Sequence, residues 1–156
     1  MARDPFRLIA RAQAEYARCI DDDRLEAWPD FFVESCVYKI TTAENLREGL
    51  EAGIIFANSR DMLRDRVSAL REANIYERQS YRHILGQPFI LSDDGATVRS
   101  DTSFLVVRIV QDGDTVIYAT GRYLDVYAID GDIAKLNERI VVCDSARIDT
   151  LLAIPL

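Results

Sequence analysis

Three Asp-Gly pairs at regular intervals constrain the fold of this chain more than any other feature of its sequence. They are Asp94-Gly95, Asp112-Gly113 and Asp130-Gly131, each eighteen residues after the one before. Asp-Gly readily adopts the positive backbone torsions that tight hairpin turns require. The segments between the pairs are rich in Val, Ile, Tyr and Thr. The spacing therefore predicts a meander of antiparallel strands of about 14–16 residues, much longer than the usual ~5–6.

Strands of that length impose a shape on the sheet. At ~3.4 Å per residue they reach ~50 Å, and a sheet that long must twist and coil on itself. Two amphipathic helices can fill its concave face: residues 6–20, whose apolar stripe has Gln13 as its one polar member, and a later helix with Leu63, Val67 and Leu70. We therefore expect an α+β fold in which the sheet wraps round N-terminal helices as a cone.

Shorter patterns place the remaining elements. Asp23 and Glu26 form a capping-box arrangement, which predicts a short helix toward Trp28 that Pro29 interrupts or restarts. Residues 35–41 are expected to form a strand, residues 42–53 a loop with a helical turn, and residues 54–56 a short strand.

The second long helix and the strand that follows it also have boundary signals. Asn58 or Ser59 is expected to cap this helix. A strand is predicted to begin near Ser80, and Gly86 and Pro88 mark a bulge or an edge.

The last hairpin has a register that its side chains suggest. A three-residue loop over residues 129–131 would put Gly131 in the left-handed position and Arg122 opposite Glu138. A two-residue loop would instead oppose Arg122 to Arg139, and like charges directly opposite each other destabilise a sheet. We therefore predict the three-residue loop and an Arg122–Glu138 pair.

Length and composition indicate an ordinary globular protein. The 156 residues suit a single domain, 1–156, and the net charge of −7 disfavours nucleic acid or an anionic membrane surface as a partner. No apolar run approaches the ~20 residues of a membrane span, and the first residues lack the apolar core of a signal peptide. Three cysteines at unrelated spacings indicate free thiols in a reducing cytoplasm.

The basic residues are seventeen arginines and only two lysines. A GC-rich genome is one explanation. The other is use at interfaces, because a planar guanidinium suits partly dehydrated ion pairs better than an ammonium does.

Few side chains are candidates for chemistry. The single histidine, His83, shares a strand face with Tyr81 and is either a general base or a hydrogen-bonded interior or interface residue. For Asp101 and Asp125, both mid-strand, we expect cross-strand ion pairs. Four strand tyrosines are expected to belong to the core or to line a pocket: Tyr38, Tyr118, Tyr123 and Tyr127.

Several reaction classes are disfavoured by the residues that are absent. One histidine and scattered cysteines do not provide the ligands of a zinc site, a two-histidine iron site or a Rieske cluster. No phosphate-binding loop and no G-x-S-x-G elbow occur. The sequence therefore argues against self-contained redox, hydrolytic or nucleotide chemistry.

Three segments carry a resemblance to a known family: DMLRDRVSALREANIYERQSYRHILG, TGRYLDVYAIDG with the following NERIVVCDS, and the terminal DTLLAIPL. They closely resemble the small (beta) subunits of aromatic-ring-hydroxylating dioxygenases. The resemblance implies a nuclear-transport-factor-2-like cone, with a strongly curved mixed or antiparallel sheet packed on N-terminal helices. It also implies that this chain holds no cofactor.

The same resemblance implies the partners. A large (alpha) subunit would hold a Rieske [2Fe-2S] cluster and a mononuclear Fe(II), usually in an alpha3beta3 hexamer. A separate reductase would supply electrons from NAD(P)H, and the substrate would be an aromatic acid similar to terephthalate.

We therefore expect a non-catalytic structural and assembly subunit of a multicomponent dioxygenase, located in the cytoplasm. The alternatives are a stand-alone isomerase or dehydratase with His83 as general base, and a small-molecule-binding module without catalysis. No catalytic, cofactor-binding or metal-binding residue is predicted. The candidate interface or cavity residues are Arg82, His83, Arg122 and Glu138.

Overall fold

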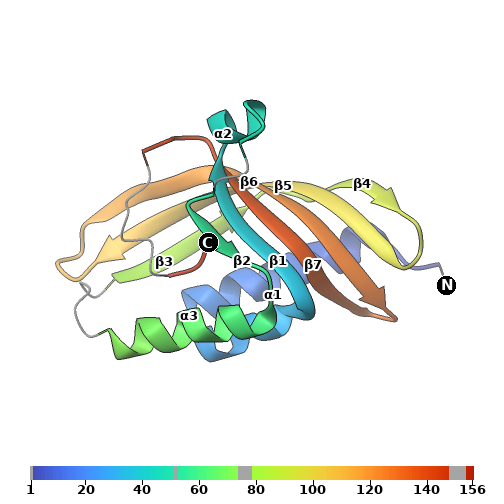
Figure 1. Cartoon of the computed structure of the whole chain (residues 1–156), viewed down its shortest axis with the longest axis horizontal. Helices are drawn as coiled ribbons and strands as arrows, with labels where there is room; N and C mark the ends of the chain where they lie inside the picture. Colours follow the sequence, from blue (N-terminus) through green and yellow to red (C-terminus); the bar gives the residue numbers. More distant parts are fainter. Residues whose placement is uncertain (1, 51–52, 74–78, 148–153) are drawn as a thin grey trace.

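A single curled sheet organises the molecule (Figure 1). The structure is a computed structural model that describes residues 2–50, 53–73, 79–147 and 154–156, and within these residues seven strands form one sheet. The strand order is β2-β1-β7-β6-β5-β3, and β4 pairs with β5. β3 and β4 follow one another along the same edge of β5. β1 and β7 run parallel and the other pairs antiparallel, so the sheet is mixed, as expected.

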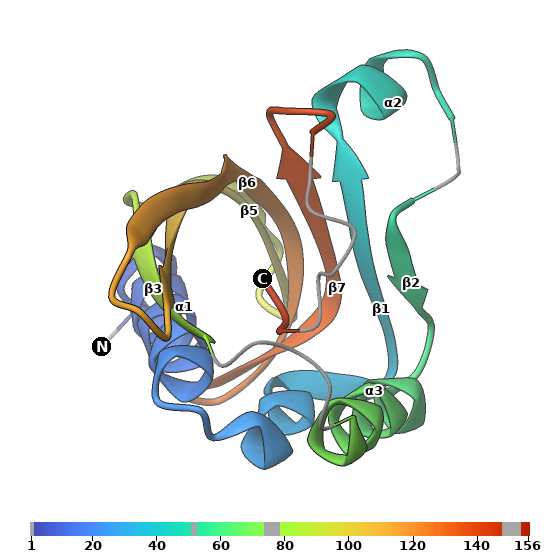
Figure 2. The same ribbon diagram turned by 90° about the vertical axis from the view of Figure 1, so that its left-hand side faces the viewer.

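The strand boundaries are as follows: β1 Phe32–Thr42, β2 Ile55–Ala57, β3 Gln79–Leu85, β4 Phe89–Asp93, β5 Thr97–Val110, β6 Thr115–Asp130 and β7 Ile133–Cys143. The helices are α1 Pro5–Asp21, the 3-10 helix η1 Leu25–Phe31, α2 Ala43–Arg47 and α3 Arg60–Glu72. Figure 2 shows the sheet curled into a cone with the C-terminal residues inside it, and α2 standing away from the body. The predicted α+β cone is confirmed.

Each Asp-Gly pair lies at a turn between strands, as predicted, although Asp130 itself is the last residue of β6. Gly95, Gly113 and Gly131 have φ values of +94°, +97° and +59°, a region that favours glycine. The strands between them are long, with 14 residues in β5 and 16 in β6, although β7 has only 11. The sheet coils because strands of this length twist along their whole course.

The predicted register of the last hairpin is wrong. The turn is the two residues Gly131 and Asp132, and a bulge between Val126 and Tyr127 then adds one residue on β7. Together these shift the pairing beyond both registers considered from the sequence. Arg122 lies opposite Val142 rather than Glu138, and its guanidinium binds Asp101 of β5 at 2.9 Å. Most of the shift comes from the position of the turn, and the bulge, which leaves no clear trace in an alternating pattern, adds one residue more.

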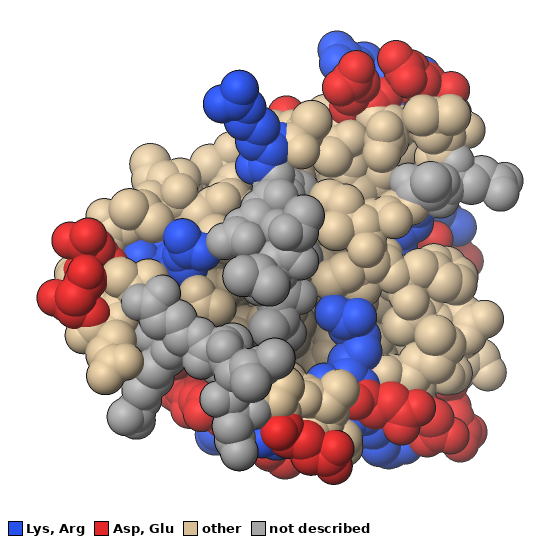
Figure 3. All heavy atoms as spheres, turned by 60° about the vertical axis from the view of Figure 1, so that its left-hand side comes forward, with Lys and Arg blue, Asp and Glu red and all other residues tan. Residues whose placement is uncertain are grey.

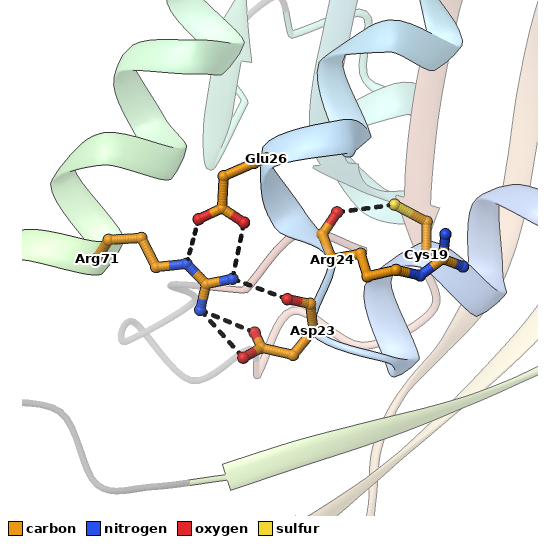
Figure 4. Close-up of polar contacts among 5 residues, drawn as sticks. All are labelled: Cys19, Asp23, Arg24, Glu26 and Arg71. Atoms are coloured by element: carbon orange, nitrogen blue, oxygen red, sulfur yellow. Dashed lines mark hydrogen bonds and ion pairs between the residues drawn. The ribbon is translucent and has the colours of Figure 1, made fainter.

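The predicted capping box is also wrong. Arg24 is the N-cap of η1 and no side chain caps it. Asp23 and Glu26 instead bind Arg71 at the end of α3 (Figure 4). The Arg71 guanidinium donates to Glu26 at 2.7 and 3.1 Å and to the Asp23 carboxylate at 3.0 and 3.1 Å. It also donates to the Asp23 carbonyl oxygen at 2.8 Å, so Arg71 fastens α3 to the turn between α1 and η1.

The other local signals are confirmed. Ser59, not Asn58, caps α3, because its hydroxyl accepts from the Met62 N–H at 3.2 Å. The helical turn expected within residues 42–53 is α2, capped by Thr42. Residues 51 and 52 of that segment lie outside the described residues. The first strand is longer than predicted and the short strand is β2.

One glycine sits where the sheet leaves no room for a side chain. Gly121 lies between Phe104 of β5 and Cys143 of β7. A Cβ at this position would overlap the carbonyl oxygen of Val142 and lie 3.0 Å from the Cα of Cys143. The close approach of backbones at this point requires glycine.

We expect Gly121→Ala to lower the free energy of unfolding by about 2 kcal/mol or more, because the added methyl group must displace strand backbone. Gly86→Ala is the matched control, since its Cβ would meet only ordinary contacts from 3.5 Å outward. The measurement is the denaturant midpoint at constant m-value. Wild-type stability of the Gly121 variant would contradict the close approach.

The Arg71 contacts predict a pH dependence. Hydrogen bonding to Arg71 lowers the pKa of Glu26. A carboxyl with a lowered folded-state pKa stabilises the protein above its unfolded value of about 4.3 and loses this effect as the pH falls through the folded value. Glu26→Gln should therefore be less stable than wild type at pH 7, by no more than about 1 kcal/mol because the side chain is largely exposed. The difference, measured by urea unfolding, should shrink below about pH 4. An unchanged difference at pH 3 would exclude this origin.

Candidate functional site

A buried ion pair lies on the concave face of the sheet. Asp125 of β6 lies directly opposite Arg139 of β7, and both side chains are fully buried. The guanidinium donates from Nε to Oδ1 at 2.9 Å and from Nη2 to Oδ2 at 2.8 Å. The expected cross-strand ion pairs of Asp125 and Asp101 are thus both confirmed. A parallel pair of hydrogen bonds of this kind is the strongest form of Arg–carboxylate contact.

Two aromatic rings contact the guanidinium. Its central carbon lies 4.1 Å from the centroid of the Tyr16 ring and 3.9 Å from that of Tyr123. Such a position over a ring face is favourable for a cation. Nη2 also donates to the hydroxyl of Tyr127 at 3.2 Å. Tyr38, Tyr123 and Tyr127 therefore belong to the core, one of the two roles expected for them.

Gln13 explains the polar position on the apolar stripe of α1. Its side-chain amide donates to the Thr102 hydroxyl at 2.9 Å and to Oδ2 of Asp125 at 3.1 Å. Gln13 therefore links α1 to β5 and β6 through the interior. The buried carboxylate of Asp125 thus accepts a hydrogen bond from Gln13 in addition to the two from Arg139.

The electrostatics of the interior favour a charged pair among neutral phenols. Burial is the largest single influence on Arg139 and opposes its charge, but the combined interactions with Asp125, Tyr127 and Tyr16, of which that with Asp125 is the largest, raise the arginine pKa well above its ordinary value. Burial also raises the pKa of Tyr123 well above its usual range. Within the cone, the cation of Arg139 lies directly against the carboxylate of Asp125.

The last residues of the sequence fill the space next to this cluster. The main-chain oxygen of Leu156 accepts hydrogen bonds from the hydroxyls of Tyr16 at 2.8 Å and Tyr38 at 3.0 Å. The Leu156 N–H donates to the Tyr38 hydroxyl at 3.1 Å, and Leu156 is fully buried. The part of the cone lined by these tyrosines is therefore occupied by the chain itself.

Grooves lie elsewhere on the described surface. One of about 330 Å³ is lined by Gln79, Ser80, Ile109, Val110 and Gln111. Another of about 290 Å³ lies between α1 and the β6–β7 turn, and His83 and Asp125 line neither. Figure 3 shows one side of the molecule, on which acidic and basic side chains form small separate groups with uncharged surface between them.

His83 has an oriented carboxylate that the sequence did not reveal. Its Nδ1 lies 2.6 Å from Oδ1 of Asp21, and its backbone N–H donates to Oδ2 at 2.9 Å. Both side chains are buried, at 0% and 6% exposure. Nε2 is buried and has no hydrogen-bond partner in the described structure.

The sequence does not identify Asp21 as the partner of His83, because Asp21 lies 62 residues earlier. It is also the first residue of the acidic run that predicts the start of a short helix. The one sequence feature that could have identified Asp21 is its position at the end of the apolar stripe of α1. The C-terminal end of a helix that packs on a sheet brings its last side chain to a strand edge.

The other three candidate residues lie on the opposite face of the sheet. Strand alternation places Arg82, Arg122 and Glu138 on the convex side, next to the inward-facing Tyr81, Tyr123 and Arg139. The structure does not bring them together with His83. Arg82 and Arg122 are exposed, and Glu138 is half-buried opposite Val126.

Among the described residues, the thiols and carboxylates do not converge on a metal centre. Cys19, Cys36 and Cys143 are buried free thiols, and burial raises the pKa of Cys143 to about 12. In the described ranges, no group of three or more His, Cys, Asp or Glu side chains converges in a way that could hold a metal ion. None of the described helices is long and apolar enough to cross a membrane.

Comparisons with known proteins agree on one family. The model of the ring hydroxylating beta subunit family matches residues 15–150. The chain is 53% identical to the terephthalate 1,2-dioxygenase terminal oxygenase component subunit beta 1 of Comamonas sp., over 95% of this chain and 96% of that one. It is 37% identical to the anthranilate 1,2-dioxygenase small subunit of Burkholderia cepacia, over 95% and 92%.

A solved structure agrees with these relatives. It is the beta subunit of a protein assigned as an aromatic-ring-hydroxylating dioxygenase from Novosphingobium aromaticivorans DSM 12444. The TM-score is 0.90 at 39% identity, and the match covers 97% of this chain and 96% of that one.

The buried ion pair leads to a stability prediction. Asp125→Leu and Arg139→Met should each lower the free energy of unfolding by about 3–5 kcal/mol, because each leaves an unpaired buried charge. The double variant should be more stable than either single variant. The exposed pair is the control: Arg122→Met should cost under about 1 kcal/mol. Urea unfolding of the complete cycle measures the coupling, and additive effects at positions 125 and 139 would show that the pair is not a unit.

Proposed function

Because this chain belongs to the ring hydroxylating beta subunit family, we propose that it is the non-catalytic assembly subunit of a Rieske non-haem iron dioxygenase that dihydroxylates an aromatic acid. The observation that carries this proposal is the filled interior. The ion pair of Asp125 with Arg139 occupies the cone together with Leu156, and no described groove reaches it. A site that binds and turns over a substrate needs a concave space with converging polar groups.

A terephthalate-like acid is the substrate class we propose. The support is 53% identity over nearly the whole chain to a component named for terephthalate, and 37% to one named for anthranilate. Both names denote aromatic acids. In this proposal the large subunit forms the substrate pocket, and the small subunit holds it in place.

The cofactors of the proposed enzyme would lie outside this chain. Its thiols are separate and buried and its one histidine is engaged by Asp21, so its residues fit neither a Rieske cluster nor a mononuclear iron. We propose that the large (alpha) subunit holds both centres in an alpha3beta3 complex. A cytoplasmic reductase would pass electrons to that complex from NAD(P)H.

A second candidate function is favoured by one observation. The His83–Asp21 pair has the geometry of an oriented general base, with Nε2 left without a partner. Against it, the His83 side chain is fully buried and lines none of the described grooves. We interpret the pair as structural: Asp21 accepts the His83 backbone N–H at the outer edge of β3 and thereby joins α1 to the sheet.

The main proposal is tested by purifying the chain alone and with its cognate large subunit. Alone it should be colourless, hold no stoichiometric iron and leave aromatic acids unoxidised even with reductase and nucleotide. Together the two chains should co-purify near one-to-one as a red-brown complex that oxygenates the ring. Iron content, visible absorbance and turnover are measured on both preparations. Stoichiometric iron or activity in the single chain would overturn the proposal.

The two candidate functions differ in what His83→Ala does. If His83 is structural, the variant should lower the yield or thermal stability of the complex while turnover per iron stays within about threefold of wild type. A positioned proton transfer typically contributes about 10²–10⁴-fold, so a loss of at least a hundredfold per iron in an intact complex would support the acid–base role. Asp21→Asn is the matched variant, because it keeps the size of the side chain and removes its charge.

A further inference from the structure

The three Asp-Gly turns share a chemical property besides their shape. The backbone nitrogen of the residue after an aspartate can attack the side-chain carboxyl carbon, and glycine hinders this attack least because it has no Cβ. All three pairs are exposed, at 94–95, 112–113 and 130–131. The β4–β5 and β6–β7 turns lie at one end of the sheet and the β5–β6 turn at the other (Figure 1). What distinguishes the pairs is how the fold holds the two reacting groups.

At the β4–β5 turn both reacting groups are held. The Asp94 carboxylate accepts hydrogen bonds from the backbone N–H groups of residues 96–97, at 3.0 and 2.7 Å. The Gly95 N–H donates to the Asp93 carboxylate at 2.9 Å. Arg3 fixes the turn further, because its guanidinium forms an ion pair with Asp93 and donates to the Gly95 carbonyl oxygen at 3.0 Å. Attack of the Gly95 nitrogen on Asp94 therefore requires several of these contacts to break.

The β5–β6 turn also holds both groups. The Asp112 carboxylate accepts a hydrogen bond from the Asp114 N–H at 2.9 Å. The Gly113 N–H donates to the Val110 carbonyl oxygen at 2.9 Å, which closes the turn. The carboxyl group of Asp112 and the nitrogen of Gly113 must each lose a hydrogen bond before they can react with each other.

The β6–β7 turn holds neither group. Among the described residues, no atom accepts a hydrogen bond from the Gly131 N–H, and the Asp130 carboxylate has neither a hydrogen-bond donor nor an ion-pair partner. The turn consists of Gly131 and Asp132 alone, so Asp130 and Ile133 form the last pair of the ladder. The ends of a hairpin open more readily than its middle. Asp130 and Gly131 can therefore approach each other with the smallest loss of contacts.

We propose that Asp130-Gly131 is a site of spontaneous covalent modification, at which aspartate converts to isoaspartate ahead of the other two Asp-Gly pairs. In the first step the Gly131 nitrogen attacks Cγ of the protonated Asp130 carboxyl group. An N–Cγ bond forms, the amide proton is lost and the carboxyl hydroxyl leaves with a proton as water, which gives a cyclic imide.

In the second step a water molecule opens the imide. It adds to the main-chain carbonyl carbon of Asp130, and the bond from this carbon to the Gly131 nitrogen breaks. The chain then runs through Cγ, and the former main-chain carbonyl becomes a free carboxylate. The first step releases a water molecule and the second consumes one, so the reaction needs no oxidant, reductant or cofactor.

The modification changes the backbone where β6 leads into β7. It inserts a methylene group into the main chain before Gly131 and creates a carboxylate next to the new linkage. Asp132, Ile133 and Ala134 line the groove of about 290 Å³ beside α1, so the wall of this groove moves with the turn. The new carboxylate is the group that an isoaspartate methyltransferase would esterify with S-adenosylmethionine. The inference is independent of the proposed function.

The test incubates the full folded chain at neutral pH and follows isoaspartate at each Asp-Gly pair by mass spectrometry of its peptides. Enzymatic methylation of isoaspartate is the second readout. Asp130 should react at least about tenfold faster than Asp94 or Asp112, because the hydrogen bonds that must first break at those two sites slow the attack by about that factor. The same chain unfolded in urea is the control, and there the three pairs should react at similar rates.

Asparagine variants compare the three turns through the same imide. Asp130→Asn, Asp94→Asn and Asp112→Asn each keep a side-chain oxygen that accepts hydrogen bonds, and each forms the imide with loss of ammonia. Deamidation is measured by the change in mass. Asp130→Asn should again react fastest, and thermal unfolding checks that each variant is folded.

Three results would overturn the proposal. The first is a faster reaction at Asp94 or Asp112 than at Asp130 in the folded chain. The second is an equal rate at all three pairs, which would mean that the hydrogen bonds of the turns do not control the reaction. The third is isoaspartate that forms only in the unfolded chain. None of these results bears on the proposed function, because none measures assembly with the large subunit.

Discussion

Burial of Arg139 beside Asp125 is the interaction on which the interior of this protein depends. A buried cation is tolerated only when a charge balances it and hydrogen bonds satisfy it, and four elements contribute to that here. The carboxylate of Asp125 comes from β6 and the guanidinium of Arg139 comes from β7. Helix α1 contributes the ring of Tyr16 and the side-chain amide of Gln13, and β5 contributes the hydroxyl of Thr102. The bulge on β7 sets Arg139 opposite Asp125, so the register of the β6–β7 hairpin decides which charged side chains meet in the core.

The same pair has consequences for function on both faces of the sheet. Because side chains alternate along a strand, a cone filled by Asp125 and Arg139 has Leu124 and Glu138 on its outside. Inside the cone the two charges of the ion pair lie against each other, and the hydroxyls of Tyr16 and Tyr38 are bound to Leu156. The chain belongs to the ring hydroxylating beta subunit family, and its described residues include no group that could hold a metal ion.

His83 shows how a sequence pattern leaves a choice open. Strand alternation correctly placed it on the same inward face as Tyr81. Whether an inward histidine is a base or a structural group depends on its neighbours in space, and its carboxylate comes from the end of a helix 62 residues earlier. The same limit applies to Asp23 and Glu26, whose spacing fits a helix cap but whose partner, Arg71, lies at the end of another helix. Local patterns identify a side chain that needs a partner, not which distant residue becomes that partner.

The sequence by itself determined the architecture of this protein. The spacing of the Asp-Gly pairs determined where the turns lie, and the length of the segments between them determined the curvature of the sheet. The apolar stripes determined which helix faces are buried. All three follow from local properties of the chain: turn torsions, strand twist and amphipathicity. The family also followed from the sequence, since its segments are specific. Only the tertiary structure decided the register beyond the bulge, the pairing of Arg122 with Asp101 and the pairing of His83 with Asp21. These depend on where distant backbones meet, and such contacts are selected by packing of the whole core rather than by neighbours along the chain.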